Sequence, residues 1–133
     1  MNYIYTAVFT PNEKGTKFYA RIPDLPGCIT TGSSLQDAIE QMTDAASGWL
    51  VVAEDKGLDI PDATPQSSVE HASSDYLSLI QVDTIAYRAA TETKAVRKNV
   101  SLPQWMATFA DQRGINCSQV LQEALKERFY SVR

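Results

Sequence analysis

The chain has 133 residues, and 44% of them are hydrophobic, so it is long enough for one ordinary domain or two small ones and apolar enough to form a core. Its longest apolar run covers residues 49–53, far short of the roughly 20 residues that a membrane-spanning helix needs. The first residues show no basic segment followed by an apolar one, so we expect no signal peptide, no membrane partner and a cytoplasmic protein. Two distant cysteines (Cys28 and Cys117) and one histidine (His71) predict no disulfide framework, no metal site and no cofactor.

Charge is distributed unevenly along the chain, although the net charge is only -4. Residues 1–87 contain 12 acidic and 4 basic residues, whereas residues 88–133 contain 4 acidic and 8 basic residues. A basic segment favours contact with nucleic-acid phosphates, and an acidic segment favours a basic protein partner. Because the charge changes sign where the sequence pattern also changes, we expect two modules with different partners.

Three strands are predicted in the first part of the chain. Residues 2–10 alternate and are rich in β-branched and aromatic residues, which predicts a strand. Turn-forming residues 11–15 separate it from a second strand at residues 17–22. A rigid connection with two prolines, residues 23–27, then leads to a third strand at residues 28–32.

A helix of about six turns is predicted next. We expect it to begin at Ser33 or Ser34, because Gln36 and Asp37 stand three residues later at the spacing of reciprocal N-terminal capping. Its apolar residues recur every three to four positions, so one side of the helix is expected to pack on a sheet. Gly57 is the expected end of the helix.

The fold class predicted by these elements is α+β. Residues 58–75 have no periodicity and are expected to form a surface loop, and a further strand follows at residues 76–82. The first domain is therefore β-β-β-α-β over residues 1–82. Residues 83–93 are predicted to be a weakly helical connector, and residues 94–133 form the second domain.

The second domain begins with a short alternating strand. One face carries Val96, Lys98, Val100 and Leu102, and the other carries Arg97, Asn99 and Ser101. A single copy of this strand cannot bury its apolar face, so we expect a second chain to complete an antiparallel ribbon. The polar face of such a ribbon fits the DNA major groove, where Arg and Asn read guanine and adenine. The alternative is a dimerisation module whose polar face is only solvated.

Two short helices are predicted to follow the strand. Pro103 ends the strand and begins the first helix, and Gly114 ends that helix. Asn116 is expected to cap the second helix. The free backbone amides at Asn116, Cys117 and Ser118 would then suit a DNA phosphate.

The second domain resembles the ribbon-helix-helix family of bacterial repressors. The resemblance lies in the Lys-Asn-Val-Ser-Leu-Pro segment at residues 98–103 and in residues 114–121, which match the Gly-x-Ser/Asn-x-Ser helix start of that family. It implies that the three outward strand residues, Arg97, Asn99 and Ser101, read bases. Cys117 departs from the family pattern, because a basic residue is common at its position.

The first domain resembles the HicB antitoxin family. Residues 18–32 contain Asp-Leu-Pro-Gly-Cys and Thr-x-Gly elements, and a Ser-Leu-Gln-Asp-Ala helix start follows them. The resemblance extends to residues 82–88 and 99–105. It implies a partial ribonuclease-H-like fold without ribonuclease activity, binding and masking of a small basic HicA-like toxin that cleaves mRNA, and repression of the antitoxin's own operon by the C-terminal ribbon-helix-helix domain. Family members are dimers or tetramers, so we expect a homodimer through residues 94–133, with a tetramer as the alternative.

Five carboxylates are the candidates for contact with the toxin. They are Asp24, Asp37, Glu40, Glu54 and Asp55. They are spread over a loop and a helix, so they do not form the carboxylate cluster with which an active ribonuclease H holds two metal ions. We expect a solvated or partner-facing surface and no catalytic residue.

Two other functions remain open at this point. A ligand-responsive ribbon-helix-helix repressor without a toxin partner would bind a small molecule in a pocket lined by residues 27–32. A ribonuclease H relative would act as an enzyme, but the dispersed carboxylates disfavour it.

Overall fold

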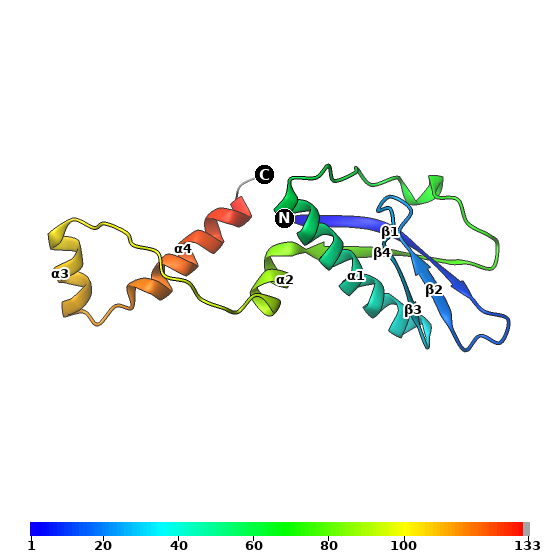
Figure 1. The fold of residues 1–133 in the computed structure, drawn as a ribbon, viewed down its shortest axis with the longest axis horizontal. Coiled ribbons are helices and arrows are strands. Elements are labelled where there is room, and N and C mark those ends of the chain that lie inside the picture. The colour runs from blue at the N-terminus through cyan, green and yellow to red at the C-terminus, as the bar shows by residue number, and fades with distance from the viewer. Residues whose placement is uncertain (132–133) are drawn as a thin grey trace. The chain divides into compact units, whose positions relative to one another are not determined.

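A computed structural model describes residues 1–131 of the chain (Figure 1). The chain forms two compact units. The first, Asn2–Glu92, is called the N-terminal unit, and the part of the chain from Thr93 onward is called the C-terminal unit. Within the described part of the chain, no helix is long and apolar enough to cross a membrane.

A four-stranded antiparallel sheet with the order β3-β2-β1-β4 forms one layer of the N-terminal unit. The strands are β1 (Asn2–Pro11), β2 (Phe18–Arg21), β3 (Ile29–Gly32) and β4 (Tyr76–Asp83). The central strand β1 pairs with β4 along almost its whole length, with Tyr5 opposite Ile80 and Phe9 opposite Tyr76. All four strands predicted for the first domain are thus confirmed, together with the mixed α+β class.

The second layer is the helix α1 (Leu35–Lys56), which lies across one face of the sheet (Figure 1). The Ser34 hydroxyl accepts a hydrogen bond from the Asp37 amide at 3.0 Å, and the Asp37 carboxylate accepts one from the Ser33 amide at 2.8 Å. This second hydrogen bond is the main reason that the pKa of Asp37 lies below its usual value. Gly57 ends α1 in the left-handed conformation, at φ 64°. Both predicted ends of the helix are confirmed.

The hydrophobic core lies between α1 and the sheet. It is formed by alternate residues of the strands and by one side of α1, including Phe9, Ile22, Met42 and Leu50. Gly32 allows the close approach of the two layers, because a Cβ atom there would lie 2.3 Å from the backbone nitrogen of Ala38. The glycine of the Thr-x-Gly element is therefore required by the packing of α1 on β3.

The segment predicted as a connector belongs to the N-terminal unit. Asp83 ends β4 and caps α2 (Thr84–Thr91), and Arg88 of α2 bonds to α1. The compact unit therefore extends to Glu92, beyond the sequence-based boundary at residue 82. Between α1 and β4, residues 58–75 form the predicted loop, with one short 3-10 turn, η1 (Gln66–Ser68).

The C-terminal unit contains α3 (Gln104–Gln112) and α4 (Cys117–Ser131). Asn116 caps α4 by accepting a hydrogen bond from the Gln119 amide at 3.1 Å, and Gly114 at φ 64° follows the end of α3. Residues 92–103 form no strand in the single chain. A ribbon strand obtains its hydrogen bonds from a second chain, so the ribbon stays a prediction.

Candidate functional site

The C-terminal unit has an unusual surface, because none of its described residues is buried. Eleven of its large apolar side chains are between 40% and 84% exposed. They are Val96, Val100, Leu102, Trp105, Met106, Phe109, Ile115, Val120, Leu125, Phe129 and Tyr130. Stable monomers rarely expose so much apolar surface together. This surface is the kind that another protein chain covers.

Much of this apolar surface lines one groove of about 600 Å³. Both helices contribute to it, and so do Lys98, Val100 and Leu102 from the segment before α3. Arg97, Asn99 and Ser101 are absent from the lining, and all three are exposed. The apolar-face residues of the predicted strand therefore line the groove, and its polar-face residues lie outside the groove.

The start of α4 lies at the edge of the same groove. Cys117 and Ser118 line the groove, and Asn116 uses its side-chain oxygen to cap the helix. The cap engages the amide of Gln119. The structure thus brings the three predicted phosphate-contacting residues together at one helix end, where the helix dipole favours an anion.

Two of the predicted toxin-binding carboxylates are engaged inside the N-terminal unit. Asp24 accepts hydrogen bonds from the amide and hydroxyl of Thr64, at 2.8 and 2.6 Å. The neighbouring Pro26 carbonyl accepts a hydrogen bond from Trp49 Nε1 at 3.0 Å. The Asp-Leu-Pro-Gly-Cys element therefore attaches the turn after β2 to α1 and to the long loop. Asp37 caps α1, so its carboxylate also has a structural role.

Glu54 and Asp55 form an ion-pair cluster with Arg88. Arg88 Nη2 lies 3.2 Å from Glu54 Oε1 and 2.9 Å from Asp55 Oδ1. The other Glu54 oxygen accepts hydrogen bonds from the hydroxyls of Tyr3 at 2.8 Å and Thr84 at 3.0 Å. Burial, followed by this hydrogen bond and the charge of Glu54, raises the pKa of Tyr3 to about 12. Glu54 thus joins three elements of the fold.

Sequence reasoning did not identify Arg88 as the partner of Glu54 and Asp55. Desolvation acts to lower the Arg88 pKa, but the hydrogen bonds that Arg88 donates to Asp55 and Glu54, together with their negative charges, outweigh this effect and raise it. The only sequence feature that could have indicated this role is that Arg88 is the single basic residue between Asp83 and Glu92, in a segment interpreted as a connector. Among the predicted toxin-binding carboxylates, Glu40 is exposed on α1 and Asp55 is 57% exposed beside Arg88.

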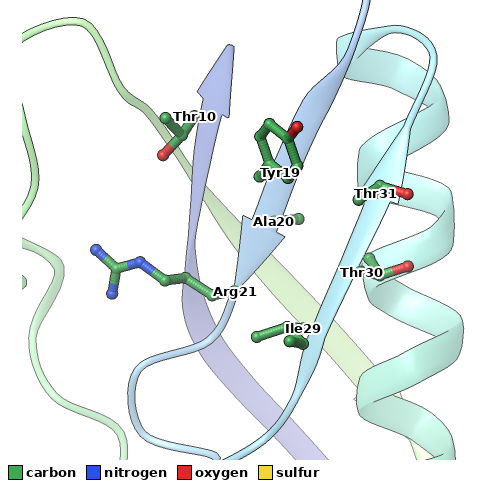
Figure 2. Close-up of a pocket in the computed structure, with 7 residues that line it drawn as sticks. All are labelled: Thr10, Tyr19, Ala20, Arg21, Ile29, Thr30 and Thr31. Atoms are coloured by element: carbon green, nitrogen blue, oxygen red, sulfur yellow. The ribbon is translucent and has the colours of Figure 1, made fainter. Parts of the chain in front are cut away.

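A shallow hollow of about 240 Å³ lies over β2 and β3 (Figure 2). Figure 2 shows Tyr19 on β2 between Thr10 of β1 and Thr31 of β3, as the strand register requires. Arg21 extends away from Ile29, and its guanidinium donates to the Glu70 carbonyl at 3.3 Å. The hollow is smaller than the roughly 300–1,000 Å³ of most small-molecule sites.

Groups with catalytic potential are not brought together in the described residues. No three His, Cys, Asp or Glu side chains within residues 1–131 are grouped as metal ligands. His71 is exposed and lies 2.9 Å from the carbonyl oxygen of its neighbour Ala72. Cys28 is buried, and burial raises the pKa of its thiol, which keeps it in the unreactive protonated form.

An acidic sheet-and-helix unit followed by a basic helical unit with an uncovered apolar face is typical of a protein whose surfaces bind other macromolecules. Residues 5–124 match the family described as the HicB-like antitoxins of bacterial toxin-antitoxin systems. The chain therefore belongs to the HicB-like antitoxin family. Among curated proteins, no sequence matches it.

Solved structures share the fold. One described as a toxin-antitoxin complex from Streptococcus pneumoniae has a TM-score of 0.60 and 19% identity, covering 96% of this chain and 99% of that one. The antitoxin HicB of Burkholderia pseudomallei has a TM-score of 0.54 and 20% identity, covering 92% of this chain and 96% of that one. These likenesses extend over both units of the chain.

Proposed function

We propose that this antitoxin binds and neutralises a HicA-like mRNA-cleaving toxin through its N-terminal unit, and represses its own operon through its C-terminal unit. The C-terminal unit acts as a ribbon-helix-helix homodimer on operator DNA. The N-terminal unit corresponds to the partial ribonuclease-H-like fold of the family and acts by binding, without catalysis.

The observation that carries the DNA-binding part is the uncovered apolar groove of the C-terminal unit. Val100 and Leu102 line the groove while Arg97, Asn99 and Ser101 stay outside it. A second copy that covers the groove pairs the two strands and leaves their polar residues outward for the major groove. Residues 93–133 contain seven basic and three acidic residues, which favours binding to DNA phosphates.

The toxin-binding part is supported by charge. Residues 2–92 contain 13 acidic and five basic residues. Such a surface attracts a basic RNA-binding toxin and competes with RNA phosphates for it. A solved toxin-antitoxin complex from Streptococcus pneumoniae has the same fold, which agrees with this role.

The test uses the purified full chain and the product of the adjacent toxin gene. We expect stoichiometric addition of the chain to stop cleavage of an mRNA substrate by the toxin. We also expect the chain to bind a DNA fragment from its own promoter, with an affinity that falls as salt rises. Continued RNA cleavage in the presence of the bound chain would contradict the antitoxin role.

The ligand-responsive repressor is the other candidate, and the hollow at Tyr19 and Thr31 is where its ligand would bind. Release of promoter DNA by a small molecule, without any toxin, would favour it. The small volume of that hollow and the acidic surface both favour the toxin-binding function.

A further inference from the structure

A second groove lies within the N-terminal unit, along the side of α1. It has a volume of about 510 Å³, and its wall includes Gly48 and Val52 of α1, Tyr87 of α2, and Leu58 just after α1. Val52 is 48% exposed and Leu58 is 55% exposed. An exposed valine near the C-terminal end of α1 and a leucine just after the helix form an apolar strip that the fold itself does not cover.

Gly48 stands in the middle of this strip without a reason in the fold. A glycine inside a helix lowers its stability relative to alanine. At Gly32 the packing explains the glycine, but a Cβ atom on Gly48 would meet only the Tyr87 hydroxyl, at 3.9 Å. The missing side chain leaves the helix backbone open to close approach from outside. Such an open backbone lets a partner protein pack closely against α1.

The one charged side chain in the wall of the groove is a carboxylate. Asp44 lines the groove, and Glu40 lies one helical turn before Asp44 on the same side of α1. The one basic residue of α1 is Lys56 in its last turn, and no lysine or arginine precedes it in the helix. Arg88 is occupied by Glu54 and Asp55. A partner that fills the apolar groove therefore meets carboxylates at its rim, and a basic surface complements them.

We infer that this groove is the surface on which the antitoxin binds its toxin, with the groove covering an apolar patch and Asp44 and Glu40 pairing with basic residues around that patch. The inference rests on the proposed function, and it names the contact surface within it. The occupant is a small basic protein, in keeping with the acidic charge of the whole N-terminal unit.

The face of the sheet opposite α1 is the competing surface. Strand register places Ile4, Tyr19 and Leu79 on it, and Leu79 is 58% exposed. Its charged groups near the hollow are the basic residues Lys17 and Arg21 and the carboxylate of Asp75, which interacts with Thr10 and Arg21. The Lys17 ammonium lies 5.3 Å from the Tyr19 ring centroid. A basic partner is less well matched there than at the groove.

The experiment compares two matched arginine substitutions in the full chain. Val52→Arg places a positive charge in the groove, and Leu79→Arg adds the same charge to the opposite face of the sheet at a similarly exposed residue. Binding to a catalytically inactive form of the adjacent toxin is measured by calorimetry. We expect Val52→Arg to raise Kd at least tenfold, the effect of losing a central interface contact. We expect Leu79→Arg to stay within about threefold of wild type.

A second variant protects the test against misfolding. Gly48→Gln fills the groove from a position where the fold has space, and glutamine favours the helix more than glycine does. Its thermal midpoint should therefore equal or exceed that of wild type, while its toxin affinity falls at least tenfold.

Each other outcome overturns the inference. If Val52→Arg and Gly48→Gln bind like wild type, the toxin does not use the groove, although the antitoxin role stands. If only Leu79→Arg weakens binding, the face of the sheet opposite α1 is the contact surface. If Val52→Arg changes the oligomeric mass without toxin present, a second copy occupies the groove. If wild type itself does not bind the toxin, the proposed function fails, and the groove assignment fails with it.

Discussion

Replacement of Glu54 by alanine tests whether the carboxylates of α1 act in folding or in partner binding. Glu54 accepts hydrogen bonds from Tyr3, Thr84 and Arg88, at 2.8, 3.0 and 3.2 Å. These residues come from β1 and α2, so the substitution loosens the attachment of both to the end of α1. Its side chain is only 18% exposed, so water replaces these contacts poorly.

The size of the effect follows from these three contacts. Each hydrogen bond to a charged group contributes roughly 1.5–3 kcal/mol. Arg88 keeps Asp55 as a partner at 2.9 Å, which offsets part of the loss. The loss then comes mainly from the Tyr3 and Thr84 hydrogen bonds, so we expect Glu54→Ala to lower the free energy of unfolding by about 3–6 kcal/mol.

The assay is urea unfolding followed by the fluorescence of Trp49 in a Trp105→Phe background, so that the signal reports the N-terminal unit. Glu40→Ala is the matched control, because Glu40 is an exposed carboxylate on the same helix. Its effect should stay within about 0.5 kcal/mol. If Glu54→Ala unfolds at the urea concentration of the parent, the Glu54 cluster contributes no stability. If it instead lowers only toxin affinity, Glu54 faces the partner, as the sequence predicted.

Four further predictions concern separate parts of the chain. The fold raises the Tyr3 pKa to about 12, so the stability that the protonated Tyr3 contributes is fully present below about pH 10 and is lost between about pH 10 and pH 12. In alkaline unfolding titrations, Tyr3→Phe should therefore lose less stability over this range than wild type does, and parallel curves would contradict this. Arg97→Ala should weaken operator binding by about 1–3 kcal/mol and relax specificity in gel-shift assays, with toxin binding unchanged; intact operator affinity would mean that the strand faces the other way. Val100→Asp should convert the dimer to a monomer in light scattering, because it puts a charge into the apolar groove of the C-terminal unit; an unchanged mass would refute dimerisation there. Gly57→Ala should lower the thermal midpoint by an amount equivalent to about 1 kcal/mol, because φ is 64° at this helix end; an unchanged midpoint would show that the helix end relaxes.

Local features of this protein could be predicted from the sequence. The Ser34 cap, the end of α1 at Gly57 and the Asn116 cap of α4 are each confirmed. Each depends on residues within three or four positions of one another, and the backbone geometry of a helix end is the same in any fold. The strands of the sheet were also predictable, because alternation along a strand is a local pattern.

Only the tertiary structure decided what the charged residues of the N-terminal unit do. Tyr3 and Glu54 are 51 residues apart in the chain, and Asp24 and Thr64 are 40 apart. Their contacts exist because the order β3-β2-β1-β4 and the packing of α1 bring these segments together. The sequence could not distinguish Asp24 and Glu54 from the exposed Glu40, because the type of an acidic residue does not show whether its carboxylate is solvated or hydrogen-bonded within the fold. The groove at Gly48 also depends on tertiary packing, because the positions of neighbouring segments decide whether a helix residue is exposed or buried.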